Sequence, residues 1–229
     1  MKGISKNKRN NILFGILLGF AIIGVCTVFL FIGRTTVDFV ETMLSPKIVR
    51  TAPEISKQFI DPNEYSRPGI KLEKVKGIVV HYTANPGTSA QQNHDYFAGL
   101  AISHETKASS HYIIGLDGEI IQCIPRDEQA YASNNRNSDT ISIECCHFDD
   151  TGEFYVQTYD SLVHLVAWLE GKYGLDEEAV IRHYDVNGKI CPKYFVDHPE
   201  EWDRFLEDVK LYIEEYGTRE PAEKSKEEE

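Results

Sequence analysis

The chain has 229 residues, a formal net charge of -12 and 41% apolar residues, and its length fits one or two domains. The apolar fraction excludes a chain that is disordered throughout, and five cysteines are too few for a small disulfide-dense scaffold. The acidic balance argues against nucleic acid as a partner, because phosphate binding needs a basic face.

A long apolar segment lies near the N-terminus. Residues 12–33 carry no charge, and as a helix at about 1.5 Å per residue they would extend roughly 33 Å, enough for a hydrocarbon core. The basic residues among residues 1–11 lie before this segment, so the positive-inside rule predicts that they are cytoplasmic. We therefore predict an uncleaved signal anchor in the lipid bilayer of the cell membrane, with everything after Arg34 on the cell-wall side.

A cleaved signal peptide is the main alternative for this segment. Its apolar core is usually about 7–15 residues long and ends in small residues, neither of which fits here. A lipoprotein modified at Cys26 fits less well, because the bulky Val25 directly precedes that cysteine.

Three regions follow the apolar segment. Residues 34–70 contain four prolines and weak periodicity, which predicts an extracytoplasmic linker. Residues 71–216 carry the periodic patterns of a folded domain, which we expect to be a monomer. Residues 217–229 have the charged composition of an acidic, solvated and disordered tail.

Apolar periodicity predicts the elements of the folded domain in chain order. Strands are expected over 77–81, 110–114, 119–124, 140–146 and 180–183, and helices over 88–101, 158–173 and 199–216. Thr88 or Ser89 caps the first helix and Gly174 ends the second, while residues 133–139 and 184–192 are loops. Strands and helices that mix without strict alternation predict an α/β fold, in which helices flank a mixed central sheet.

Three residues at strand ends and in a loop are candidate metal ligands. His81 ends the first predicted strand, His183 ends a short apolar run about a hundred residues later, and Cys191 follows eight residues after His183. Two neutral imidazoles and one thiolate suit Zn²⁺, and three protein ligands leave a fourth position open, as in catalytic sites. The alternatives are structural histidines, and a disulfide from Cys191 to Cys123, Cys145 or Cys146.

Two charged residues are candidates for catalysis. Glu144 lies inside an otherwise apolar strand, where it is a member of a buried ion pair, a hydrogen-bonded structural acid, or a general base beside a metal-bound water. Lys189, two residues before Cys191, is either a solvated loop cation or a group that stabilises a developing oxyanion.

Four segments together resemble a known family. They are GIVVHYTA at 77–84, SSHYIIGLDGEI at 109–120, NSDTISIECC at 137–146 and RHYDVNGKICP at 182–192. In this order and spacing they are similar to the zinc-dependent N-acetylmuramoyl-L-alanine amidases, a family that includes phage lysozyme-amidases, bacterial autolysins and peptidoglycan recognition proteins. The last segment is the most specific, and the resemblance covers roughly residues 70–210.

The resemblance implies one zinc ion on His81, His183 and Cys191, with Glu144 as catalytic acid/base and Lys189 as transition-state stabiliser. The implied substrate is peptidoglycan, cut at the amide between N-acetylmuramic acid and L-alanine. Some members carry a catalytic tyrosine where this chain has Ser110, so the proton-transfer role is expected to fall to Glu144.

Three other functions remain open from the sequence. Some proteins of this family only bind peptidoglycan, so a receptor of the same fold without catalysis is the first. A zinc-free hydrolase that uses Cys191 and His183 is the second, and a membrane scaffold with an inert ectodomain is the third. His111 lies in the second of the four segments, and it either lines the groove that binds the substrate or has a structural role.

Overall fold

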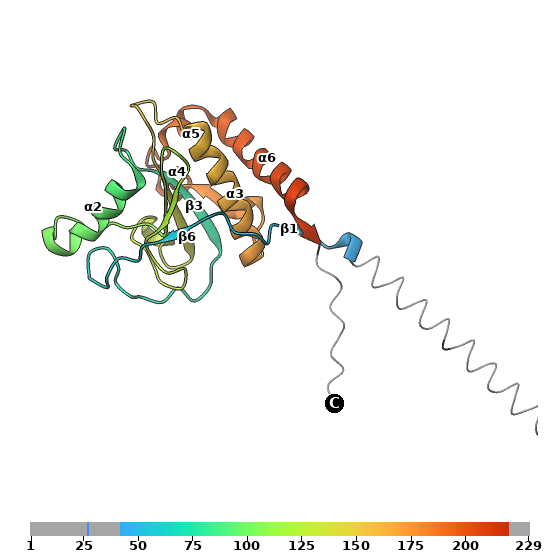
Figure 1. Cartoon of the computed structure of the whole chain (residues 1–229), viewed down its shortest axis with the longest axis horizontal. Coiled ribbons are helices and arrows are strands. Elements are labelled where there is room, and N and C mark those ends of the chain that lie inside the picture. The colour runs from blue at the N-terminus through green and yellow to red at the C-terminus, as the bar shows by residue number, and fades with distance from the viewer. Residues whose placement is uncertain (1–26, 28–41, 220–229) are drawn as a thin grey trace, which may run out of the picture. The chain divides into compact units, whose positions relative to one another are not determined.

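The computed structural model describes Thr27 and residues 42–219 (Figure 1). Residues Lys47–Thr218 form one compact unit. Except for Thr27, the predicted signal anchor at 12–33 lies outside the described residues, as does the predicted tail from residue 220 onward. Among the residues that are described, no helix has the length and apolar character needed to cross a membrane.

Six strands of the compact unit form one mixed sheet in the spatial order β2-β5-β4-β6-β3-β7. Their bounds are β2 Ser56–Lys57, β3 Gly77–Tyr82, β4 Tyr112–Ile114, β5 Ile120–Gln122, β6 Thr140–Cys145 and β7 Val180–Arg182. β3 pairs in parallel with β6 and with β7, whereas β4 and β5 form an antiparallel hairpin. Two further strands are β1 (Lys47–Ile48) and β8 (Thr218–Arg219).

Helices cover both faces of this sheet (Figure 1). The α-helices are α2 Ala90–Ser103, α3 Val156–Tyr173, α4 His183–Asn187, α5 Lys193–Asp197 and α6 Pro199–Tyr216, and the 3-10 turns are η1 Asn134–Arg136 and η2 Glu177–Ala179. α3 and α6 share one hydrophobic core with the sheet, and α2 belongs to a second core with β4 and β5.

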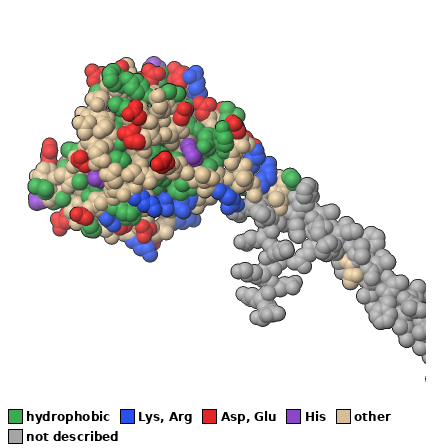
Figure 2. Space-filling model, in the orientation of Figure 1, with side chains coloured by type: hydrophobic (Ala, Val, Ile, Leu, Met, Phe, Trp, Pro, Cys, Tyr) green, Lys and Arg blue, Asp and Glu red, His purple; other side chains and the backbone are tan. Residues whose placement is uncertain are grey.

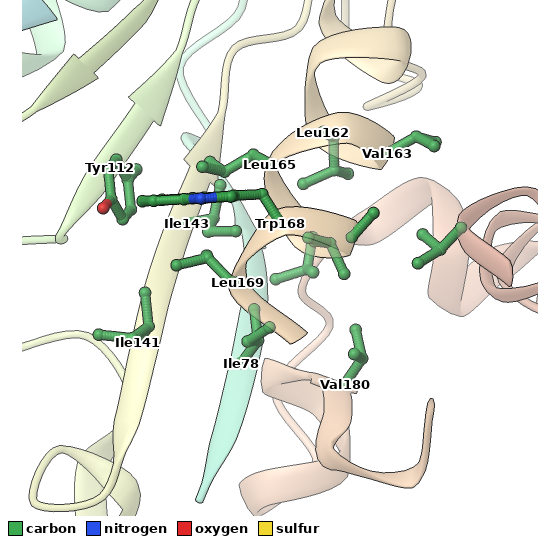
Figure 3. Packing of buried hydrophobic residues seen from close by; sticks show 14 of the residues in the cluster. Ile78, Tyr112, Ile141, Ile143, Leu162, Val163, Leu165, Trp168, Leu169 and Val180 are labelled. Carbon is green, nitrogen blue, oxygen red and sulfur yellow. The ribbon is translucent and has the colours of Figure 1, made fainter. Parts of the chain in front are cut away.

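The alternation of side chains along the strands decides which residues enter which core. Ile78 and Val80 of β3 and Ile141 and Ile143 of β6 all enter the core beneath α3. Figure 3 shows side chains of α3 pointing toward these strands. Because the side-chain period of a strand is two, the residues between them face the α2 side of the sheet. His81 and Glu144 therefore lie on the face opposite α3.

The fold confirms the predicted mixed sheet with flanking helices, and most elements lie where periodicity placed them. Ser89 is the N-cap of α2, where its hydroxyl accepts the backbone N–H of Gln92 in a capping box. Gly174 ends α3 in the left-handed conformation at φ 62°. Both predicted helix ends thus follow from ordinary capping chemistry.

The structure differs from the sequence expectation at two places. The compact unit begins at Lys47 rather than at residue 71, because β2 adds to the edge of the sheet beside β5 and Ile60 is buried in the second core. The loop expected over 184–192 begins as a short helix, α4. The side chain of Asp185 accepts a hydrogen bond from the backbone N–H of Arg182 at the start of this helix, and Gly188 ends it at φ 81°.

The core beneath α6 gives a stability prediction. Phe205 is fully buried against the rings of Phe195 and Trp202, so Phe205→Ala is expected to lower the free energy of unfolding by about 3–5 kcal/mol. Leu211→Ala on the exposed side of the same helix is the control, with an expected change within about 0.5 kcal/mol. Urea unfolding followed by circular dichroism measures both, and equal losses would contradict this packing.

Candidate metal centre and active site

Two of the three predicted ligands come from neighbouring parallel strands. His81 is the second-last residue of β3, and His183 directly follows β7. Val80 is the register partner of Arg182, so the next residue on each strand is a histidine. The carboxyl ends of parallel strands lie at one edge of a sheet, where ligands commonly bind. Sheet pairing alone therefore brings the two imidazoles together.

The third ligand, Cys191, reaches the same place after α4. Its Sγ lies 3.8 Å from Nδ1 of His81, and the Nδ1 atoms of His81 and His183 lie 3.1 Å apart. All three ligand atoms are within 4.8 Å of one another, and all three residues are buried. The structure thus brings the predicted ligands into one cluster that can hold a metal ion.

Two polar residues hold the imidazole rings from behind. Nε2 of His81 lies 3.2 Å from Oγ of Ser133, and Nε2 of His183 lies 2.8 Å from Oδ1 of Asn134. An amide oxygen only accepts, so Nε2 of His183 carries the proton and its Nδ1 presents a lone pair to the cluster. Such outer hydrogen bonds fix the tautomer and the orientation of metal-binding histidines.

The loop that carries Ser133 and Asn134 is itself fixed by polar contacts. Oδ1 of Asn137 accepts the backbone N–H groups of Ala132 and Ser133 at 3.1 and 2.6 Å. Asn134 has a left-handed backbone at φ 54°, a conformation that asparagine tolerates better than most residues. Sequence reasoning identified a polar loop here but missed its contacts with the histidines, for which its run of asparagines was the only signal.

The electrostatics of the cluster favour neutral imidazoles. Burial, with help from His183 and Lys189, lowers the pKa of His81 well below its ordinary value. Burial and then Lys189 lower the pKa of His183 to about 4. Burial also raises the pKa of Cys191 to about 12, with Glu144 adding to the shift. A thiol in this position loses its proton readily only when a cation coordinates the sulfur.

Glu144 lies beside the cluster, directly opposite His81 in the β3–β6 register. Burial raises the pKa of this carboxyl to about 8, and Lys189 opposes the shift. Its Oε2 is buried and has no hydrogen-bond partner within the described part of the chain. Among the described residues, Oε2 therefore takes part in neither of the predicted structural roles, a buried ion pair or a hydrogen-bonded acid, and it remains available to a bound molecule.

Glu144, Lys189, His81 and His183 line one cleft of about 390 Å³. Lys189 is exposed and lies just after the left-handed Gly188 that ends α4. The rest of the cleft is lined by Phe97, Lys107, Ala108, Ser109, Tyr131, Ala132, Asn134, Asn137 and Asn187. The cleft thus combines the two histidines of the candidate metal cluster, one acid and two lysines.

The described cysteines and His111 have no part in a disulfide or in the lining of the cleft. Cys123, Cys145, Cys146 and Cys191 are all free, which removes the disulfide alternative for Cys191. Nδ1 of His111 accepts the backbone N–H of Ser142 at 3.0 Å, and its Nε2 lies 2.9 Å from the carbonyl oxygen of Glu128. His111 therefore has partners at both nitrogens and does not line the cleft.

Comparison with known proteins identifies relatives. The family model described as N-acetylmuramoyl-L-alanine amidase matches residues 71–194. N-acetylmuramoyl-L-alanine amidase CwlL of Bacillus licheniformis is 40% identical over 169 residues, which cover 68% of this chain and 46% of the relative. N-acetylmuramoyl-L-alanine amidase BlyA of Bacillus subtilis (strain 168) is 32% identical over 176 residues, with the same two coverages. The chain thus spans about half the length of the curated relatives it matches.

Solved structures share the fold of this chain. PlyL is 28% identical with a TM-score of 0.60, and the match covers 69% of this chain and 97% of PlyL. The catalytic domain of XlyA is 26% identical with a TM-score of 0.58, over 69% of this chain and 99% of that domain. On the family match across more than half of its length, this chain belongs to the N-acetylmuramoyl-L-alanine amidase family.

Proposed function

We propose that this protein is a zinc-dependent N-acetylmuramoyl-L-alanine amidase that hydrolyses the amide between N-acetylmuramic acid and the L-alanine of the stem peptide. The observation that carries the proposal is the convergence of His81, His183 and Cys191 into one cluster, whose two histidines line a cleft together with Glu144. The names of the relatives point to the same bond.

The spacing of the ligand atoms supports zinc as the metal. Zinc binds nitrogen at about 2.0–2.1 Å and sulfur at about 2.3 Å, so tetrahedral ligands lie about 3.3 Å apart for two nitrogens and about 3.6 Å apart for nitrogen and sulfur. The separations of 3.1 Å between the imidazole nitrogens and 3.8 Å between Cys191 and His81 are close to these values. When bound there, zinc supplies Lewis-acid chemistry that polarises the scissile carbonyl and makes water more acidic.

Glu144 is the acid/base of the proposed reaction. As the carboxylate, it takes a proton from the water that attacks the lactyl carbonyl. As the acid, it returns this proton to the nitrogen of L-alanine when the carbon–nitrogen bond breaks. Its buried oxygen has no competing hydrogen-bond partner among the described residues, which supports this role.

Lys189 stabilises negative charge on the carbonyl oxygen as the tetrahedral species forms. Lys189 lines the cleft and lies on the segment between His183 and Cys191, so the same segment positions a metal ligand and this cation. A fixed positive charge of this kind lowers the barrier because it stabilises the transition state more than the neutral substrate.

We further propose that the protein is a monomer, anchored in the cell membrane by residues 12–33 with the amidase domain on the cell-wall side. The uncharged length of that segment and the basic residues before it support this arrangement. Anchoring would confine hydrolysis to peptidoglycan within reach of the membrane.

Zinc binding gives a test that does not depend on activity. The purified chain, stripped with a chelator and dialysed against zinc, is expected to hold one ion per chain. Cys191→Ser and His183→Ala are expected to abolish this stoichiometry, while His198→Gln on the surface leaves it intact. Asn134→Gly keeps the left-handed backbone but removes the amide oxygen from His183, so affinity should fall about 10–100-fold. Unchanged zinc content in Cys191→Ser would contradict the site.

Digestion of purified peptidoglycan tests the reaction. The zinc-loaded chain is expected to release stem peptides with a free L-alanine amino terminus, identified by mass spectrometry. Glu144→Gln should lower the rate about 10²–10⁴-fold because it removes the acid/base, and Lys189→Ala should lower it about 10²–10³-fold because it removes a charge that stabilises the transition state. Zinc content should be unchanged in both variants. Lys210→Ala, on the exposed side of α6, is the control and should have the wild-type rate.

The other candidate functions predict different outcomes of the same experiment. A non-catalytic receptor would bind peptidoglycan and zinc but release no peptide. A cysteine hydrolase would retain activity in the chelator and lose it after alkylation of Cys191. Cleavage at another bond would leave a different terminus on the released peptide.

A further inference from the structure

A second concave surface, which we call the basic groove, lies away from the candidate active site. It has a volume of about 630 Å³ and is lined by Lys57, Lys74, Arg126 and Lys172, together with the aromatic rings of Phe59 and Tyr173. Two carboxylates, Glu73 and Asp127, also line it. Cations thus outnumber acids two to one here, in a chain whose net charge is -12.

The cations of the basic groove are not used in ion pairs within the described residues. Arg126 and Lys172 instead lie 5.1 and 5.7 Å from the ring centre of Trp168, which holds their stems near the surface of α3. Lys57 and Lys74 are exposed, and Phe59 leaves 44% of its surface in solvent. Exposed lysines beside an exposed aromatic ring are typical of surfaces that contact membrane headgroups.

The basic groove and the active site lie at opposite edges of the sheet. Val75 lines the groove two residues before β3 begins, whereas His81 lies at the far end of the same strand. Lys172 and Tyr173 belong to the last turn of α3. Figure 2 shows Lys and Arg side chains gathered along the lower edge of the compact unit, the edge from which β3 runs upward in Figure 1.

The chain enters the compact unit next to this groove. Ile48 and Val49 pack against Gly171 of α3, where an added β-carbon would lie 3.0 Å from Cβ of Ile48, and Lys172 of the groove is the next residue. Only residues 34–46 separate the predicted membrane segment from this point, which allows a reach of at most about 45 Å.

We propose that the basic groove docks on the headgroups of anionic phospholipids in the membrane that anchors the chain. The proposal rests on the membrane anchorage proposed above. Docking would turn the edge of the sheet that carries His81 and Glu144 away from the bilayer, toward the peptidoglycan. An acidic domain on an acidic membrane would otherwise be repelled from the surface.

The full-length chain in vesicles of phosphatidylcholine, with and without phosphatidylglycerol, tests the proposal. Hydrogen exchange of backbone amides over 71–76 and 170–174 is expected to slow only in the vesicles that contain phosphatidylglycerol. Each basic residue at an anionic surface contributes roughly fivefold to binding, so Lys57→Gln/Lys74→Gln should weaken docking up to roughly 25-fold. Arg204→Gln/Lys210→Gln on α6 removes the same charge outside the groove and should retain protection.

The controls separate the failure of docking from the failure of anchoring. Flotation in high salt measures anchoring, because salt releases electrostatic docking but not a membrane-spanning helix. A chain that leaves the vesicles contradicts the anchor. If the chain stays on the vesicles, either of two results overturns headgroup docking. One is equal hydrogen exchange over 71–76 in vesicles with and without phosphatidylglycerol, and the other is an equal loss of protection in the two double variants. Equal protection by soluble poly(glycerol phosphate) on neutral vesicles would instead assign the groove to an anionic wall polymer. Wild-type digestion of soluble muropeptides by Lys57→Gln/Lys74→Gln confirms that the variant is folded.

Discussion

The parallel pairing of β3 with β6 and β7 is the constraint on which the site depends. This register places His81 opposite Glu144 and brings His183 out of the neighbouring strand at the same edge. A slip of one residue would turn His81 into the core beneath α3, because successive side chains of a strand face opposite sides. The apolar residues Ile78 and Val80, which have no chemical role, thus fix the geometry of the candidate metal cluster by being buried.

The same arrangement requires polar groups to be buried, and this has an energetic cost. Buried imidazoles, a thiol and a carboxyl each lose hydration, and Oε2 of Glu144 has no partner that replaces it within the described chain. Ser133 and Asn134 offset part of the cost at the histidines, and Asn137 holds the loop that presents them. A cation among the ligands would offset more, since it favours the deprotonated sulfur and the lone pairs of both rings.

The sequence predicted the parts of the molecule that repeat regularly, and it missed the parts that depend on single distant contacts. Periodicity located β3, β6, α3 and α6, and residue type with family resemblance identified the three candidate ligands that the structure brings together. Two-residue β2 has no period to detect, so residues 47–70 resembled a linker although they belong to the compact unit. The hydrogen bonds from Ser133 and Asn134 join residues about fifty positions apart, and no local pattern encodes such pairs.

The positions of the charged residues on this domain explain more than the net charge does. The acidic total explains why long-range attraction to anionic wall material should be weak, and it would also keep an anchored domain away from an anionic bilayer. In the proposed arrangement, the basic groove at one edge of the sheet overcomes that repulsion locally, within about one Debye length of the membrane, roughly 8 Å in physiological salt. Lys189 and Lys107 lie at the opposite edge, where they line the cleft. Parallel strands begin at one edge of a sheet and end at the other, so β3 and its parallel neighbours hold the basic groove and the cleft apart.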